Sequence, residues 1–313
     1  MVNLQDIQAA QARIHNYVRH TPLVEARPVK QRVSRAETLY LKLECLQICG
    51  SFKARGAVNK LLSIPPEQLQ YGLVTASGGN HGLGVAYAGW IAKVPVTIYL
   101  PKSTPIVKAH MLEHWGAKVI FAGAVWDEAN RAALQASEQE GLNYIHPFAD
   151  PSVIAGQGTL GLEILADAPD IDTLLVAIGG GGLIAGVSSA VRSLKPGIKV
   201  IGIEPVGAPT LYESVRAGKV VELSQITTAA GTLAPRSSAA INLEIIQQHV
   251  DDIVLVTDAE MREAARWLWL EMGIAAELSG AAAVAALLSG KISPTPSDKV
   301  CALVCGAGTD GMQ

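Results

Sequence analysis

A run of four consecutive glycines restricts the possible folds of this chain more than any other feature, and it consists of Gly179, Gly180, Gly181 and Gly182. Glycine loses more backbone entropy on folding than any other residue, so such a run is costly unless something compensates for it. An apolar segment, residues 173–178, precedes the glycines, and a segment of helical periodicity, residues 183–194, follows them. A strand, a glycine loop and a helix N-terminus in this order favour an α/β fold whose loop N–H groups hold a phosphate.

Apolar segments alternate with amphipathic segments along most of the chain. We expect strands at residues 38–43, 72–75, 94–100, 118–121, 173–178, 199–203, 252–256 and 299–305. We expect helices near residues 4–18 and at residues 53–63, 81–92, 105–115, 126–140, 153–166, 183–194, 259–271 and 279–288. The alternation predicts an α/β fold with mostly parallel sheets that are flanked by helices.

The middle of the chain, residues 72–147, contains a β-α-β-α-β-α run of its own, and no linker separates it from its neighbours. We therefore expect two interleaved lobes. Residues 1–71 and 148–313 form the larger domain in this interpretation, and residues 72–147 form the smaller one. Small ligands tend to bind in a cleft between two such lobes.

Composition excludes several classes of function. Of the 313 residues, 49% are hydrophobic and 17% are charged, which is enough apolar material for a large core. The formal net charge is −3 and no basic stripe is present, so we do not expect a nucleic-acid partner. The N-terminus lacks the apolar run of a signal peptide, and the longest apolar stretch, residues 278–288, predicts a buried helix rather than a membrane span. We expect a cytoplasmic protein.

The four cysteines form two pairs with C-x3-C spacing, namely Cys45 with Cys49 and Cys301 with Cys305. Cys301 belongs to an apolar run that predicts a buried strand, whereas zinc ligands usually lie on turns. Reduced thiols are therefore the favoured interpretation, and a structural zinc site is the alternative. Because Cys305 stands where a strand ends, its side chain is expected to face the ligand crevice of an α/β sheet.

The segment around Lys53 combines a helix start with a cation. Ser51 is a plausible N-cap, which places Lys53 in the first turn of the helix. The partial positive charge at a helix N-terminus disfavours an ammonium and favours the neutral amine, which is the form that makes an imine. A solvated surface lysine is the alternative for this segment taken alone.

A second loop of small residues follows the strand at residues 72–75. Its backbone N–H groups, beside a helix N-terminus, suit a carboxylate or a phosphate, and the side chains of Asn80 and His81 add hydrogen-bonding groups. An ordinary glycine-rich turn is the alternative.

For the glycine run, the alternative is a Rossmann dinucleotide site with Glu204 as its acidic residue, but that site has no use for Lys53 or for the asparagine loop.

These motifs in this order resemble the fold-type II pyridoxal-phosphate enzymes, and within them the serine/threonine dehydratase and serine racemase group. The resemblance runs from about residue 15 to the end of the chain and includes residues 20–23, 42–44, 146–148 and 154–159. It implies a tryptophan-synthase-β-like fold and pyridoxal 5'-phosphate as the cofactor. By this resemblance, the residues that hold the cofactor are Phe52, Lys53, Asn80, Gly179, Gly180, Gly181, Gly182, Leu183, Glu277 and Cys305.

The resemblance also implies a role for each of these groups. Lys53 forms the imine with the cofactor and later moves the Cα proton, Phe52 lies against the ring, and Asn80 binds the ring's 3-oxygen. The glycine run with the Leu183 amide holds the phosphate. Cys305 faces the pyridine nitrogen, and a thiol does not keep that nitrogen protonated as a carboxylate does, which favours prompt loss of a β-leaving group.

The substrate implied by the resemblance is a small amino acid whose carboxylate is received by Ser77, Gly78, Gly79, Asn80 and His81. The implied reaction is the conversion of L-threonine, L-serine or a related 3-hydroxy-amino acid to a 2-oxo acid and ammonia. Racemases of this group carry a serine where Gly78 stands, and β-replacement relatives usually carry a threonine where His81 stands. A racemase or β-replacement enzyme is therefore the disfavoured alternative, and a non-catalytic binding protein is the third.

Some relatives bind a divalent cation through a glutamate, a carbonyl four residues later and an aspartate two residues beyond. Glu204 and Ala208 match the first two positions, but the third is Thr210. The resemblance thus implies at most a weak Mg²⁺ or Mn²⁺ site, and a structural role for Glu204 is the favoured alternative. It also implies a homodimer, which no residue pattern indicates independently.

Overall fold

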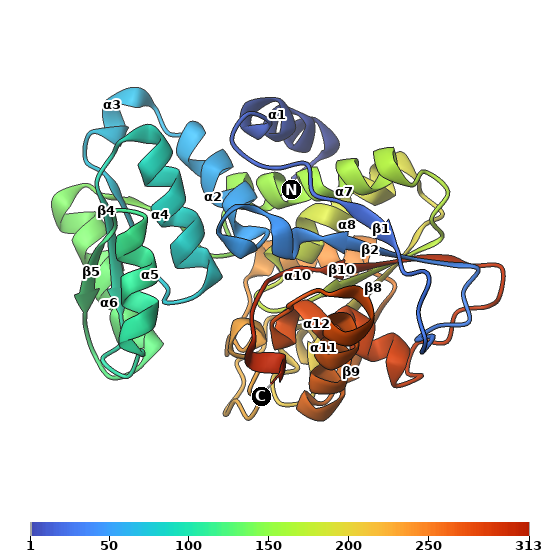
Figure 1. Ribbon diagram of the computed structural model, residues 1–313. Helices are drawn as coiled ribbons and strands as arrows, with labels where there is room; N and C mark the ends of the chain where they lie inside the picture. The colour runs from blue at the N-terminus through green and yellow to red at the C-terminus, as the bar shows by residue number, and fades with distance from the viewer. Residues whose placement is uncertain (1, 313) are drawn as a thin grey trace.

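The computed structural model describes residues 2–312, and the larger of its two sheets has six strands in the order β1-β2-β10-β7-β8-β9 (Figure 1). All neighbouring strands are parallel except β1, which pairs antiparallel with β2. The strands are β1 (Leu23–Glu25), β2 (Thr38–Leu43), β7 (Thr173–Ala177), β8 (Lys199–Pro205), β9 (Asp252–Val256) and β10 (Lys299–Val304). Strands from both ends of the chain thus lie in one sheet.

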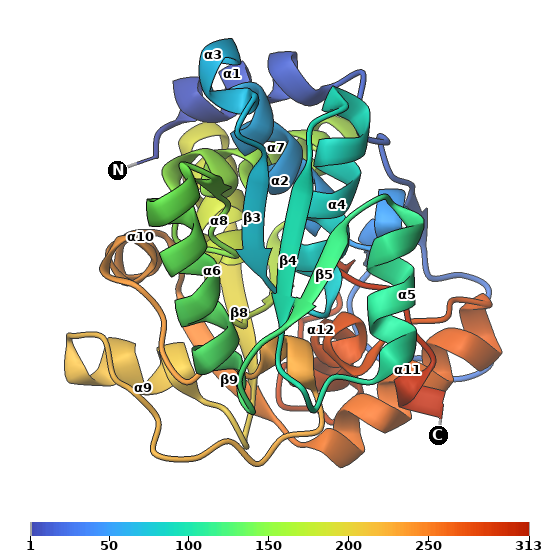
Figure 2. The same cartoon turned by 90° about the vertical axis from the view of Figure 1, so that its left-hand side faces the viewer.

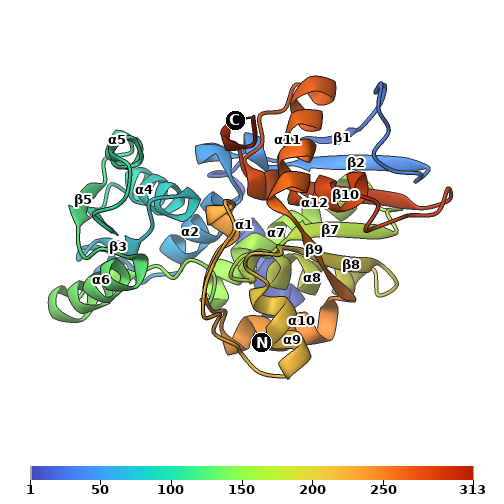
Figure 3. The ribbon, with the colours of Figure 1, turned by 90° about the horizontal axis from the view of Figure 1, so that it is seen from below.

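The smaller sheet has four parallel strands in the order β5-β4-β3-β6 (Figure 2). They are β3 (Leu73–Ala76), β4 (Val96–Leu100), β5 (Lys118–Phe121) and β6 (Asn143–Tyr144). Its helices are α4 (Asn80–Ala92), α5 (Ile106–His114) and α6 (Trp126–Glu140). Seen from below, this sheet and its helices are set to one side of the larger sheet (Figure 3).

Helices cover both faces of the larger sheet, with α7 and α8 on one side and α11 and α12 on the other (Figure 1). These and the remaining helices are α1 (Leu4–Ile14), α2 (Lys53–Leu62), α3 (Pro66–Leu69), α7 (Pro151–Asp167), α8 (Gly182–Leu194), α9 (Thr210–Ala217), α10 (Ala240–His249), α11 (Asp258–Met272) and α12 (Leu278–Leu288). Short 3₁₀ helices are η1 (Glu44–Leu46), η2 (Ile48–Gly50), η3 (Gly231–Leu233) and η4 (Asp310–Met312).

The structure confirms the α/β fold that the sequence predicted, with mostly parallel sheets flanked by helices. The sequence did not predict β1, β6, α3, α9 and α10. The two strands have three and two residues, which is too short for an alternating pattern, so their pairing partners define them. The helix α10 buries Leu243, Ile245 and Ile246 and packs against α8.

All four strands of the smaller sheet lie between Leu73 and Tyr144. The domain limits at residues 72 and 147 stay a proposal.

The apolar stretch that predicted a buried helix forms α12, whose residues from Leu278 to Leu287 are buried against the larger sheet. Among residues 2–312, no helix combines the length and the apolar character needed to cross a membrane.

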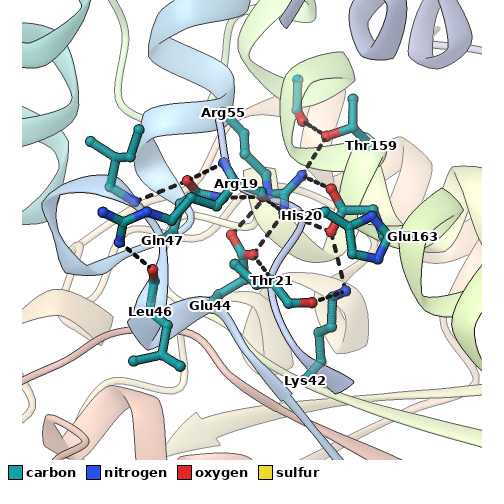
Figure 4. Close-up of polar contacts among 12 residues, drawn as sticks. Arg19, His20, Thr21, Lys42, Glu44, Leu46, Gln47, Arg55, Thr159 and Glu163 are labelled. Atoms are coloured by element: carbon teal, nitrogen blue, oxygen red, sulfur yellow. Dashed lines mark hydrogen bonds and ion pairs between the residues drawn. The ribbon is translucent and has the colours of Figure 1, made fainter. Parts of the chain in front are cut away.

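A buried cluster of charges fixes the position of α2 (Figure 4). The guanidinium of Arg55 donates to both carboxylate oxygens of Glu44 at 2.8 Å and to those of Glu163 at 2.6 and 2.9 Å. Lys42, which is fully buried, contacts the same Glu163 at 3.1 Å and Asp167 at 3.0 Å. The cluster therefore joins α2 to β2, η1 and α7, and it fixes the helix that begins with Lys53.

We expect Arg55→Met to lower the free energy of unfolding by about 3–5 kcal/mol, because Glu44 and Glu163 would lose their common cation while still buried. Urea unfolding followed by circular dichroism measures this. Lys299→Met is the control, since its pair with Asp170 lies at the surface and its loss should change stability far less. Equal effects of the two substitutions would contradict the importance assigned to the cluster.

Candidate active site

Four segments that are distant in the sequence meet beyond the carboxyl ends of the strands. The glycine loop follows β7 and Cys305 follows β10, and these two strands are neighbours in the larger sheet. The Phe52 amide donates to the carbonyl of Cys305 at 3.3 Å, which joins the lysine segment to this edge. The Asn80 amide group donates to Glu277 at 2.8 Å, so the asparagine loop meets the same place from the smaller sheet.

The amine of Lys53 donates to the carbonyl of Pro147 at 2.6 Å and lies 5.1 Å from the centre of the Phe52 ring. Burial lowers the pKa of Lys53 to about 8, although the nearby Cys305 and Glu277 oppose this shift. Near neutral pH, the unprotonated fraction of the Lys53 amine is thus far larger than that of an ordinary lysine.

The capping expectation at this helix was wrong. The N-cap of α2 is Phe52, without a side-chain cap, and the buried hydroxyl of Ser51 has no hydrogen-bond partner within residues 2–312. Ser51 instead forms a β-bridge with Gly306, since its backbone is extended. The backbone of Ser51 therefore pairs with the turn that follows Cys305, and its side chain does not cap α2.

The glycine loop presents main-chain donors that no protein group uses. Within the described chain, the amides of Gly180, Gly181, Gly182 and Leu183 donate to no protein acceptor. Gly181 has a φ of 92°, and a Cβ on Gly180 would overlap the ring of Phe148. Side chains are thus excluded here by sterics, and the free N–H groups at the start of α8 form a cradle for an anion.

In the asparagine loop, the side chain of His81 does not face the site. Its Nε2 lies 3.1 Å from the Thr75 hydroxyl and 2.9 Å from the Ile145 carbonyl, and burial lowers its pKa to about 3. The hydrogen bonds of the His81 ring thus go to Thr75 and Ile145, and the role of His81 in receiving a substrate carboxylate stays a prediction. Gly78 has Thr104 and Leu100 as its nearest side-chain neighbours, at 3.1 and 3.3 Å from the position of a Cβ.

Glu277 is the centre of a polar cluster that the sequence only partly indicated. Its Oε1 accepts from Asn80, from the hydroxyl of Thr232 at 3.3 Å and from that of Ser279. Burial raises its pKa. Thr232 and Ser279 were missed because isolated hydroxyl residues in a loop and at a helix start carry no spacing signal.

Burial also raises the pKa of the Cys305 thiol, and its Sγ lies 3.5 Å from the carbonyl of Ser279. The group is thus a neutral, weak donor. A neutral thiol does not supply the charge that would keep a neighbouring ring nitrogen protonated. Cys45, Cys49 and Cys301 are also free thiols.

Glu204 is buried at the end of β8, the strand that pairs with β7 in the larger sheet. Its carboxylate oxygens accept from the amides of Leu211 at 2.9 Å and Tyr212 at 2.8 Å, at the start of α9, and burial raises its pKa to about 8. The Ala208 residue is buried, and the Thr210 hydroxyl donates to Pro235. No group of three metal-ligating side chains occurs in residues 2–312.

The residues present fit pyridoxal phosphate. The unpartnered loop amides match a phosphate, and the buried amine of Lys53 matches an aldehyde that forms an imine. The thiol of Cys305 and the Asn80–Glu277 pair would supply polar groups for a heteroaromatic ring.

Comparison with known proteins gives the same result. The sequence model of the family described as "Pyridoxal-phosphate dependent enzyme" matches residues 14–306. The L-threonine ammonia-lyase of Thermotoga maritima is 41% identical over 92% of this chain and 72% of its own length, and that of Geobacter sulfurreducens is 40% identical over 96% and 74%. A catabolic L-threonine dehydratase of Staphylococcus aureus is 36% identical over 99% of this chain and 90% of its own length.

Solved structures show the same fold at similar identity. Maize serine racemase superposes with a TM-score of 0.92 at 33% identity, covering 98% of this chain and 93% of the other. The processed form of threonine deaminase isoform 2 from Solanum lycopersicum superposes with a TM-score of 0.91 at 36% identity, covering 97% of this chain and 83% of the other.

We expect cofactor attachment to accelerate as the pH rises toward about 8, because only the neutral Lys53 amine attacks an aldehyde and its pKa is lowered by burial. Below that pH, the rate should fall about tenfold per pH unit. Stopped-flow absorbance after mixing the cofactor-free chain with pyridoxal phosphate measures this. Nα-acetyl-lysine is the control, and the same pH profile for both amines would contradict the expectation.

We expect Gly180→Ala to raise the dissociation constant for pyridoxal phosphate more than about tenfold, since a Cβ there meets the Phe148 ring and displaces the loop amides. Gly197→Ala is the matched control, because its Cβ would meet nothing within 4 Å. Titration of the cofactor-free variants, followed by tryptophan fluorescence, gives the two constants. Unchanged binding by Gly180→Ala would show that the loop does not hold the phosphate.

Proposed function

The chain belongs to the family of pyridoxal-phosphate-dependent enzymes, and from this premise we propose that it is an ammonia-lyase for L-threonine, L-serine or a related 3-hydroxy-amino acid. The β-hydroxyl group leaves as water, and hydrolysis of the resulting enamine, which takes up one water molecule, releases ammonia and leaves a 2-oxo acid. The observation that carries the proposal is the convergence of the buried Lys53 amine with two loops of main-chain donors. Relatives named L-threonine ammonia-lyase, similar over nearly the whole chain, support the reaction type.

The main-chain donors bind and orient the reacting groups. In this proposal, the amides of Gly179–Leu183 hold the phosphate, and the loop from Ser77 to His81 holds the substrate carboxylate. When bound, pyridoxal phosphate supplies an aldehyde for the substrate amine and a ring that withdraws electrons from Cα. Phe52, whose ring lies 5.1 Å from the Lys53 amine, would pack against that ring, and Asn80 would donate a hydrogen bond to its 3-oxygen.

Lys53 moves the proton. Its neutral amine takes the Cα proton, and the Pro147 carbonyl accepts one of its N–H groups and so directs the lone pair. Burial lowers its pKa to about 8 and so increases the fraction of the amine that is in the reactive, neutral form. Because the Cys305 thiol carries no charge, it would not keep a pyridine nitrogen protonated, and prompt departure of the β-hydroxyl would be favoured.

A racemase is the second candidate, and the similarity to maize serine racemase favours it. Racemisation needs a second acid–base group on the face opposite Lys53, and in this chain that position is Gly78, which has no side chain. β-Replacement is disfavoured because relatives with that activity usually carry a threonine where this chain has His81. A non-catalytic protein would have no use for a buried, deprotonatable Lys53.

We propose that Glu204 caps α9 rather than binding Mg²⁺ or Mn²⁺. Each of its oxygens already accepts a main-chain hydrogen bond, and the position of the third ligand, Thr210, has its hydroxyl directed to Pro235. A cation held by Glu204 and the Ala208 carbonyl is the alternative, and the assay below distinguishes the two.

The proposal also includes the domain organisation, the assembly and the location. Residues 72–147 form a smaller domain that closes over the substrate, and residues 1–71 with 148–313 form the cofactor-binding domain. The active enzyme is a cytoplasmic homodimer whose partner is a small amino acid.

We expect the purified, cofactor-loaded chain to release 2-oxo acid and ammonia from at least one of L-threonine, L-serine, L-threo-hydroxyaspartate and L-phenylserine. Lys53→Ala should lower turnover at least about 10²–10⁴-fold, because proton transfer from Cα loses its base. The exposed Lys102→Ala is the control and should keep full activity. Turnover should be the same with magnesium and with a chelator.

Other outcomes would contradict specific parts of this proposal. Formation of D-serine without 2-oxo acid would favour the racemase, and a visible cofactor band without any product would favour the non-catalytic protein. Loss of turnover in the chelator, restored by magnesium, would favour the cation at Glu204.

A further inference from the structure

Asn242, on α10, bridges two main-chain segments of the candidate site. Its side chain is fully buried, and its Nδ2 donates to the carbonyl of Gly180 at 2.7 Å and to that of Phe148 at 3.2 Å. Its Oδ1 has no hydrogen-bond partner within residues 2–312. Burying the unpaired Oδ1 costs free energy, and an apolar side chain at this position would not have this cost. The asparagine therefore contributes through the two hydrogen bonds that its Nδ2 donates.

At one end of the bridge, Asn242 holds the turn that contacts Lys53. His146 Nδ1 accepts from the amides of Phe148 at 3.2 Å and Ala149 at 2.9 Å, while Asn242 holds the Phe148 carbonyl. The Phe148 N–H and the Pro147 carbonyl belong to one planar peptide group and point in opposite directions. Fixing this turn therefore fixes the carbonyl that accepts from the Lys53 amine at 2.6 Å.

At the other end, Asn242 holds the glycine loop. The Gly180 carbonyl accepts from Asn242 and also from the hydroxyl of Ser238 at 2.9 Å. Peptide planarity then sets the direction of the Gly181 N–H, one of the donors without a protein acceptor. The same side chain thus orients the amine end and the phosphate end of the site.

We propose that Asn242 is a positioning residue that sets the separation between the Lys53 amine and the phosphate-binding amides, so that both ends of pyridoxal phosphate are held at once. The inference rests on the proposed use of Lys53 and the glycine loop by the cofactor. A ligand held at two prearranged ends gains affinity because the second contact loses little further freedom. Only a side chain with two N–H donors at this distance serves both carbonyls, and an aspartate or leucine has none.

A double-mutant cycle tests this inference. The dissociation constant of pyridoxal phosphate is measured on cofactor-free protein for the unaltered chain, Asn242→Ala, Lys53→Ala and the double variant. We expect Asn242→Ala to weaken binding about tenfold or more when Lys53 is present, but only about twofold when Lys53 is absent, because the two sites are coupled. Asn242→Ser, which keeps one donor, should fall between the unaltered chain and Asn242→Ala.

Asn59→Ala is the matched control. Asn59 is also a buried asparagine, and its Nδ2 donates to the Ser152 carbonyl at 2.7 Å, outside the two loops. It should lower the thermal unfolding temperature without changing cofactor affinity. If it weakens binding as much as Asn242→Ala does, the effect of Asn242 is general destabilisation, and the inference is overturned.

The remaining outcomes separate the inference from the proposed function. If the unaltered chain does not bind pyridoxal phosphate, both are overturned. If it binds, and Asn242→Ala and Asn242→Ser lose nothing or lose equally with and without Lys53, only the role of Asn242 is overturned.

Discussion

The buried charge cluster around Arg55 is the interaction on which the rest of the site depends. One guanidinium pairs with Glu44, at the start of η1, and with Glu163, in α7, so α2 cannot shift without leaving two buried carboxylates unpaired. Lys53 lies two residues before Arg55, in the first turn of the same helix. The position of the reactive amine is thus set by a polar network whose members come from four segments of the chain, and not by the helix start itself, which has no side-chain cap.

The second constraint is that the site is built mainly of main chain. The glycine loop, the asparagine loop and the Pro147 carbonyl contribute peptide groups, and side chains such as Asn242, Ser238 and His146 act by fixing the direction of those groups. Peptide donors carry no net charge and need no proton uptake, so they bind an anion with the same geometry over a wide range of pH. The requirement for glycine at Gly180 and Gly181 follows from the close approach of Phe148 and from a positive φ.

Much of this arrangement could be predicted from the sequence because the decisive signals are local. A strand, four glycines and a helix are contiguous, and so are Lys53 and its neighbours, so their type and order indicated an α/β fold and an anion site. The capping error arose where a local rule competed with a distant partner. Ser51 satisfies the pattern of a helix cap, but its extended backbone pairs with Gly306.

The sequence by itself thus determined the fold class, the lysine and the two loops, because each depends on residue types that are adjacent in the chain. Only the tertiary structure decided which side chains face one another. Thr232 and Ser279 reach Glu277, Asn242 reaches both Phe148 and Gly180, and Glu204 reaches the start of α9. The physical reason is that a hydrogen bond between residues tens of positions apart leaves no periodicity or spacing in the sequence, and it exists only when packing brings donor and acceptor within about 3 Å.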